Sequence, residues 1–204
     1  MAQLRRFAFP AFAALMLLLP ALPVPDFWIT QSNYIGMYSL VAIGLVLLTG
    51  VAGLTSFGQA AFVGVGAYSA AFLAVKMSGS PWLALLVGIA LAVAAAVLLG
   101  AITLRMSGHY LPLATIAWGL ALNYTMANME WLGKYDGILG IPTLKIAGYD
   151  LGSGRGLHVL IWAMALLAAL LSTHLLDSRP GRAIRSLKGG ATMAVAMGIS
   201  SFRA

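Results

Sequence analysis

Six long apolar runs, separated by short polar segments, dominate the chain. None of them contains a lysine, an arginine or an aspartate, and their only acid, Glu130, lies near the end of one run. A helix of about 20 apolar residues crosses a bilayer, so the pattern predicts an all-α, polytopic transmembrane helical bundle with about six spans. The runs are Phe7–Val24, Tyr34–Gly53, Ala60–Val75, Trp82–Leu104, Tyr110–Trp131 and Leu157–Leu176.

The overall composition agrees with a membrane protein. Hydrophobic residues make up 61% of the chain and the mean hydropathy is +0.95, against roughly 45–50% apolar residues in soluble domains. The formal net charge of +7 raises the question of nucleic acid, but nucleic-acid binders carry their Lys and Arg on one face of a solvated scaffold. Here the cations lie in short segments between apolar runs, so we expect membrane lipid and no nucleic acid as a partner.

The chain shows no motif for catalysis or for cofactor binding. It has no cysteine for a thiolate metal site, and it has neither a phosphate-binding loop nor a His-Glu-x-x-His motif. His109, His158 and His174 lie at the edges of different runs, without the close spacing of metal ligands. We expect interfacial roles for these histidines, and we expect no metal, no cofactor and no enzyme activity.

The distribution of charge predicts the orientation in the membrane. Arg5 and Arg6 precede the first run and favour a cytoplasmic N-terminus, and six crossings return the C-terminus to the cytoplasm. The whole net charge then falls on the cytoplasmic side, and the external side sums to zero. A cleaved signal peptide at Phe7–Leu19 is the alternative, although the prolines after it make a poor cleavage site. The cytoplasmic charges are Arg5, Arg6, Arg105, Arg179, Arg182, Arg185, Lys188, Arg203 and Asp177; the external ones are Lys76, Lys134, Lys145, Arg155, Asp26, Glu130, Asp136 and Asp150.

This topology divides the chain into two parts. Residues 1–176 form a transmembrane core, and residues 177–204 form a cytoplasmic segment. The core includes an external loop at 132–156, which carries turn signals such as Asp136-Gly137 and Gly140-Ile141-Pro142.

A polar, glycine-rich segment interrupts the apolar pattern between the second and third runs. Thr49–Gln59 holds three glycines, two threonines, a serine and a glutamine, without a charge. Irregular backbone at membrane depth is tolerated only where it is buried in protein or lines a cavity, and transporters place such breaks along their substrate paths. We interpret the segment as a helix break near a transport path, with an ordinary cytoplasmic turn as the alternative. Its candidate path residues are Thr55, Ser56 and Gln59.

Asn123 is an amide inside the fifth run. Exposing an amide to lipid is costly, so its side chain should face other helices or water. Either a hydrogen bond to a neighbouring helix or a contact with substrate satisfies it. Four residues share its helical face at offsets that fit an α-helix: Thr115, Gly119, Met126 and Glu130.

The third run has a smooth face. Gly66, Ala70 and Ala74 recur at four-residue spacing, and small residues let membrane helices approach closely. We expect this face to pack on another helix. A pathway faced by Tyr68 and Ser69 is the alternative.

A basic segment follows the last run. Arg179–Lys188 holds four cations, and Gly189–Ile199 is small and uncharged. We expect Pro180 to end the sixth span and Gly181 to permit a sharp turn into a short surface helix, whose small residues fit a groove of a partner protein. Binding of the cations to anionic lipid headgroups is the alternative. The small face comprises Ala183, Leu187, Ala191, Ala194 and Gly198.

These segments together resemble a known family, the membrane subunits of branched-chain amino-acid ABC importers, and within it the LivM type. The matching motifs run in the family's order from about Tyr34 to Ile199, so the resemblance covers most of the chain. They are Gly53-Leu54-Thr55-Ser56-Phe57-Gly58-Gln59-Ala60-Ala61-Phe62, Gly66-Ala67-Tyr68, Gly108-His109-Tyr110-Leu111-Pro112-Leu113-Ala114-Thr115, Asp136-Gly137-Ile138-Leu139-Gly140-Ile141-Pro142, Gly181-Arg182-Ala183-Ile184-Arg185 and Ala196-Met197-Gly198-Ile199.

The resemblance implies an inner-membrane, multi-pass permease subunit for leucine-like amino acids. It implies three kinds of partner: ATP-binding subunits that supply the energy, a second permease subunit and a periplasmic amino-acid-binding protein. Thr55, Ser56, Gln59 and Asn123 would be the polar partners of the zwitterionic substrate. The segment that couples to the ATPase would contain Gly181, Arg182, Ala183, Arg185, Leu187, Ala194 and Gly198.

Two features depart from the family pattern. Gly189-Gly190-Ala191 and Val195 stand where many members carry acids, which affects the polar contacts expected with the ATPase. Family members also continue with further spans, so the resemblance implies a truncated chain. The alternative functions are a self-contained secondary transporter or channel for small solutes, which would need an intramembrane acid or ion site, and a structural membrane scaffold.

Overall fold

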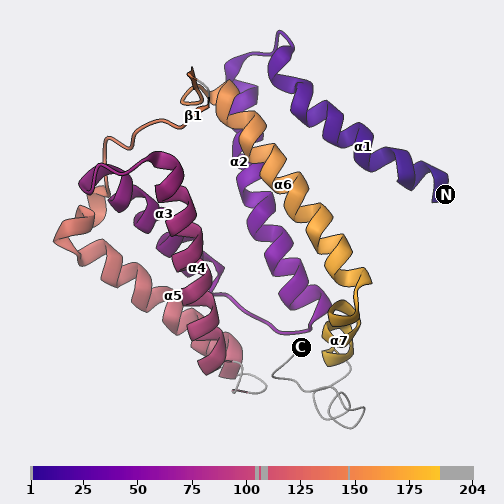
Figure 1. Ribbon diagram of the computed structural model, residues 1–204. Coiled ribbons are helices and arrows are strands. Elements are labelled where there is room, and N and C mark those ends of the chain that lie inside the picture. Colours follow the sequence, from indigo (N-terminus) through magenta and orange to yellow (C-terminus); the bar gives the residue numbers. More distant parts are fainter. Residues whose placement is uncertain (1, 104–105, 107–109, 147, 189–204) are drawn as a thin grey trace. The chain divides into compact units, whose positions relative to one another are not determined.

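The computed structural model describes residues 2–103, 106, 110–146 and 148–188, and within them the chain forms seven α-helices (Figure 1). The helices are α1 (Ala2–Leu18), α2 (Asp26–Leu45), α3 (Gln59–Lys76), α4 (Pro81–Thr103), α5 (Tyr110–Asn128), α6 (Gly154–Asp177) and α7 (Arg179–Leu187). Short elements join them: the 3₁₀ turns η1 (Leu19–Ala21), η3 (Glu130–Leu132) and η4 (Lys134–Asp136), the π-helix η2 (Val46–Val51), and the antiparallel strands β1 (Lys145–Ile146) and β2 (Tyr149–Asp150). The predicted all-α membrane fold is confirmed.

Four helical segments of the described chain are long and apolar enough to cross a membrane. They are Asp26–Val51, which joins α2 to η2, and the helices α3, α4 and α6. A shorter apolar helix, Ala8–Ala21, lies near the N-terminus. Helix α5 has 19 residues, but its asparagines lower its hydropathy, so composition alone does not identify it as a span.

The contacts of α5 indicate that it also crosses the membrane. The chain divides into two compact units, Met1–Gly53 with Lys145–Ala204 and Leu54–Leu144. In the second unit α5 runs parallel to α3: Gly58, just before α3, lies against Thr115 near the start of α5, and Phe72 near the end of α3 packs edge-on against Trp131, just beyond α5. A helix that accompanies a membrane-spanning helix along its length traverses the same depth. The directions of α3 and α5 therefore support a further crossing by α5.

The smooth face of α3 packs on α4. A Cβ at Gly66 would lie 3.5 Å from the Ala92 Cβ, and one at Gly88 would lie 2.7 Å from the Gly66 carbonyl oxygen. Ala74, on the same face, is buried. The predicted packing role of this face is confirmed.

In the first unit, α2 and α6 also run parallel. Gly36 lets them approach closely, because a Cβ there would lie 2.7 Å from the Ile161 Cγ2. Trp162 Nε1 donates to Ser32 Oγ at 3.1 Å, and Phe12 of α1 packs edge-on against the Trp162 ring. Parallel α2 and α6 fit an odd number of crossings between them, as α3, α4 and α5 provide. The six-span topology and its sidedness remain predictions.

A buried polar cluster joins α1, α2 and α6 and corrects two expectations. His158 is fully buried rather than interfacial: its Nδ1 lies 2.7 Å from Asn33 Oδ1 and its Nε2 lies 2.9 Å from the Met16 carbonyl oxygen. Asn33 Nδ2 donates to the Gly154 carbonyl at 2.8 Å. Helix α2 therefore begins at Asp26 and not at the predicted Tyr34, because residues of α6 provide hydrogen-bond partners for Ser32 and Asn33, which interrupt the apolar run there.

Candidate transport site

The predicted break between the second and third spans is present in the structure. Helix α2 widens into the π-helix η2, and Ala52 N–H donates to the Leu47 carbonyl at 3.0 Å. Gly53 then adopts a left-handed φ of 74°, a conformation that glycine accepts without steric cost. Irregular backbone follows until α3 begins at Gln59. A substrate role for the break is still a prediction.

Thr115 of α5 holds the chain that enters α3. Phe57 N–H donates to Thr115 Oγ1 at 3.1 Å, and that hydroxyl donates to the Pro112 carbonyl at 2.9 Å. Gly58 is buried beside it, where a Cβ would meet the Thr115 carbonyl oxygen at 3.4 Å. The irregular segment is thus fixed to α5 by one hydroxyl and by close packing.

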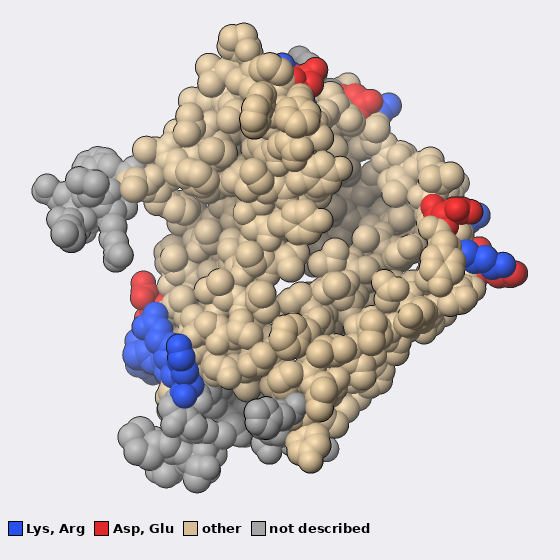
Figure 2. All heavy atoms as spheres, turned by 180° about the vertical axis from the view of Figure 1, so that it is seen from behind, with Lys and Arg blue, Asp and Glu red and all other residues tan. Residues whose placement is uncertain are grey.

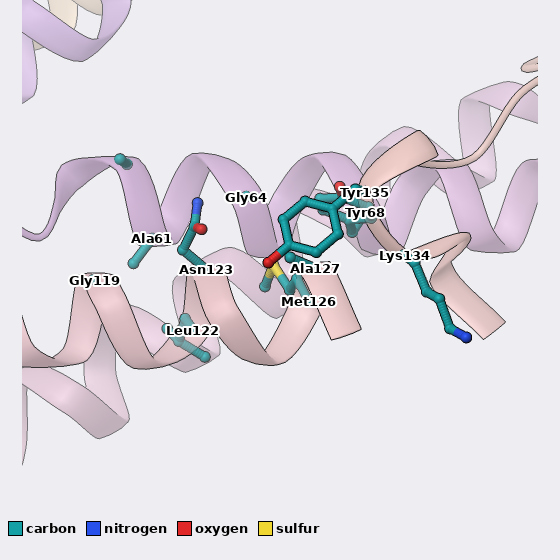
Figure 3. Close-up of a pocket in the computed structure, with 11 residues that line it drawn as sticks. Ala61, Gly64, Tyr68, Gly119, Leu122, Asn123, Met126, Ala127, Lys134 and Tyr135 are labelled. Atoms are coloured by element: carbon teal, nitrogen blue, oxygen red, sulfur yellow. The ribbon is translucent and has the colours of Figure 1, made fainter. Parts of the chain in front are cut away.

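A cavity of about 230 Å³ lies between α3, α5 and the turn η4 (Figure 3). Most of its wall is apolar, and polar groups come from Tyr68, Asn123, Lys134 and Tyr135. Lys134 Nζ pairs with Glu130 Oε1 at 2.8 Å. Its remaining lining residues are Ala60, Ala61, Gly64, Gly119, Leu122, Met126 and Ala127.

Asn123 is the one predicted path residue that lines this cavity. Figure 3 shows its amide projecting from α5 toward α3, near Ala61 and Gly64. Its side chain is exposed and makes no hydrogen bond to another described residue. The sequence left two interpretations of Asn123 open. The hydrogen bond to a neighbouring helix is absent from the described chain, so the amide is available to a ligand.

The other predicted path residues lie at the break rather than on the cavity wall. Ser56 is buried, and its Oγ accepts from Gly58 N–H at 3.4 Å. Thr55 is exposed, and Gln59 is partly exposed at the first position of α3, beside the lining residue Ala60. Gln59 directly precedes a cavity-lining residue in the sequence. Ser56 instead forms a local hydrogen bond within the break.

The basic segment forms α7, and its turn differs from the expected one. The break after α6 falls at Ser178, whose Oγ accepts from Gly181 N–H at 3.3 Å and caps α7. Pro180 therefore lies in the first turn of α7, where proline is well tolerated. Gly181 is buried in this turn, not at a bend, and a Cβ there would overlap the Leu175 carbonyl oxygen.

The cations of α7 are exposed and gather in one cluster, blue at the lower left of Figure 2. Of the predicted coupling residues, Arg182 and Arg185 are exposed and Ala183 is half-buried. Arg182 Nη1 donates to the Asp177 carbonyl at 3.3 Å, and Arg185 Nη2 lies 4.0 Å from Asp177 Oδ1. Leu187 ends α7, whereas Ala194 and Gly198 lie outside the described residues.

Sequence reasoning missed two contributions. Tyr135 lines the cavity, and Lys188 Nζ donates to the Gly50 carbonyl at 3.0 Å. Tyr68, which the sequence offered as a residue that faces a pathway, also lines the cavity. No sequence signal connects Lys188 with Gly50, because the two residues are far apart in the chain.

Comparisons with known proteins agree with this architecture. The LivM permease protein of the high-affinity branched-chain amino acid transport system of Escherichia coli (strain K12) is 31% identical over 115 residues, which are 56% of this chain and 27% of that protein. The protein of the same name from Salmonella typhimurium (strain LT2) is 30% identical over 115 residues, with the same coverage. The matched stretch thus spans about a quarter of these relatives. No solved structure matches the chain.

The family model provides the widest match. The family described as branched-chain amino acid transport system / permease component matches residues 27–204, which include the break, the cavity and α7. With its several apolar helices, the chain is a multi-pass membrane protein of a transporter family. The chain therefore belongs to the branched-chain amino acid transport system permease family.

Proposed function

We propose that this chain is a permease subunit of an ABC importer and passes leucine-like amino acids across the inner membrane. The observation that carries the proposal is the cavity between α3 and α5, which combines an apolar wall with the amide of Asn123, unpaired among the described residues. Family membership supplies the transport class.

The lining suits a small amphiphilic solute. Leu122, Met126 and the alanines offer a surface for a branched aliphatic side chain, which gains free energy from leaving water. The zwitterionic end needs hydrogen-bond partners in such a place. Asn123 and the hydroxyls of Tyr68 and Tyr135 are the available groups, and the Lys134–Glu130 pair stands at the same cavity.

The energy for uphill transport would come from partners. Two ATP-binding subunits would dock on the cytoplasmic segment at α7, a second permease subunit would complete the path, and a periplasmic amino-acid-binding protein would deliver the substrate. The exposed cations of α7 and the family resemblance of Gly181–Arg185 support this docking surface. Binding of the same cations to lipid is the competing interpretation.

Leucine uptake by the assembled, full-length transporter in proteoliposomes tests the proposal. Asn123→Ala removes the free amide of the cavity, and we expect KM for leucine to rise about tenfold, the effect of one hydrogen bond to a charged group. Asn128→Ala is the matched control, because Asn128 lies on the same helix and its side chain donates to the Tyr124 carbonyl within that helix at 2.7 Å.

Two results would contradict the proposal. Equal KM values for Asn123→Ala and the wild type would remove this cavity from the path. Leucine uptake by the chain without ATP-binding subunits would favour the alternative of a self-contained transporter or channel.

A further inference from the structure

Within the first unit, both ends of helix α7 contact other segments. At its start, the missing side chain of Gly181 lets its first turn lie directly on the backbone of Leu175 and Leu176 at the end of α6. At its end, Lys188 lies against the break that follows α2. The helix therefore bridges the ends of two parallel spans.

The contact at Lys188 has a polar and a steric part. The last carbonyls of a helix lack partners within the helix and carry partial negative charge. Lys188 Nζ donates to one of them, the Gly50 carbonyl, at 3.0 Å. Lys188 Cα also lies 3.3 Å from the position that a Cβ of Gly53 would occupy, so the two backbones are in close contact.

The break touched by Lys188 leads directly into the candidate transport site. Leu54 begins the second unit immediately after Gly53. The chain is next held at Phe57, whose N–H donates to Thr115 of α5. Only a short, anchored stretch of backbone therefore separates the Lys188 contact from a helix that lines the cavity.

We propose that Lys188 is a positioning residue that makes α7 and the Gly50–Gly53 break move as one body, so that displacement of α7 reaches the substrate path. This inference rests on the proposed function, in which ATP-binding subunits act on α7. A merely lipid-bound lysine would need neither the Gly50 carbonyl nor the glycine at residue 53.

The first test compares substitutions in the assembled, full-length transporter. Lys188→Met keeps much of the side chain's bulk and removes its donor, and we expect leucine uptake per ATP hydrolysed to fall about tenfold, the effect of one charge-assisted hydrogen bond. ATP-binding subunits should still co-purify. Lys188→Arg retains a donor and should restore at least half of the coupling. Lys76→Met is the control, since Lys76 is an exposed lysine at the end of α3, outside both α7 and the cavity lining.

The second test replaces the hydrogen bond with a covalent one. The Lys188 Cβ lies 3.6 Å from the Cβ position at residue 53, which is within the range for a disulfide, and the chain has no cysteine of its own. In a Gly53→Cys/Lys188→Cys variant, oxidation should form the disulfide and raise uptake per ATP at least fivefold over the reduced form. Comparing the two redox states of one variant cancels the strain of a side chain at residue 53.

The outcomes separate this inference from the proposed function. No leucine uptake by the wild-type complex would reject the proposed function itself. Normal coupling in Lys188→Met, or equal losses in Lys188→Met and Lys76→Met, would overturn the role of Lys188 while leaving the permease function intact. Absence of the disulfide, or an oxidised variant no more active than the reduced one, would also overturn it.

Discussion

Replacing Gly88 with alanine tests the close packing of α3 and α4. The new Cβ would lie 2.7 Å from the Gly66 carbonyl oxygen and 3.0 Å from the Ala70 Cβ. The first of these atoms is backbone, so no side-chain rotation relieves the clash and the helices must separate. Overpacking of this kind costs about 1–3 kcal/mol, and alanine recovers at most about 1 kcal/mol of helix propensity. We expect a net loss of about 1–2 kcal/mol in the free energy of unfolding.

The measurement is the equilibrium unfolding of the purified chain in mixed detergent micelles, followed by circular dichroism. Gly100→Ala is the matched control on the same helix, because nothing lies within 4 Å of a Cβ at Gly100. This control should unfold at the wild-type midpoint or gain up to about 1 kcal/mol. If Gly88→Ala and Gly100→Ala unfold at the same midpoint, the close approach at Gly88 is wrong.

Two further predictions concern the break and the topology. Gly58→Leu should reduce uptake by the full-length complex more than tenfold at near-normal membrane abundance, because a leucine side chain is too large for the space beside Thr115. Gly58→Ala should retain wild-type uptake. Normal uptake by Gly58→Leu would show that the segment is an ordinary turn. Leu139→Cys, at an exposed loop position, should react with a membrane-impermeant thiol reagent in intact cells, and Arg179→Cys should not; labelling of Arg179→Cys without permeabilisation would reverse the orientation.

Much of this architecture could be predicted from local sequence signals. The apolar runs predict the helices, glycines and hydroxyl residues predict the break, and the four-residue spacing of Gly66, Ala70 and Ala74 predicts a packing face. These signals suffice because each depends on residues close together in the chain. The sequence also singles out Asn123, since a polar group in a span must find a partner, but it left open whether that partner is a neighbouring helix or a substrate.

Features that depend on distant contacts could not be predicted. The hydropathy pattern places Asn33 outside the membrane helix, and the position of His158 at the edge of an apolar run predicts a residue at the membrane interface. Each becomes a buried partner of the other only after α2 and α6 meet. The sequence pattern predicts neither the start of α2 nor the contact between Lys188 and Gly50. In both cases the two residues in contact are more than a hundred positions apart in the chain.

The order of synthesis means that the cluster around α6 can form only after α6 has been made. Arg155 donates to the Pro20 and Val24 carbonyls and pairs with Asp26 at 2.9 Å, so α6 closes a corner that α1 and α2 leave open. A ribosome adds about 5–20 residues each second, so roughly 5–20 s pass between the synthesis of α2 and that of α6. The contiguous unit Leu54–Leu144 emerges whole in that interval. Nascent chains that stall before α6 therefore hold Asn33 and the open carbonyls without their partners in α6.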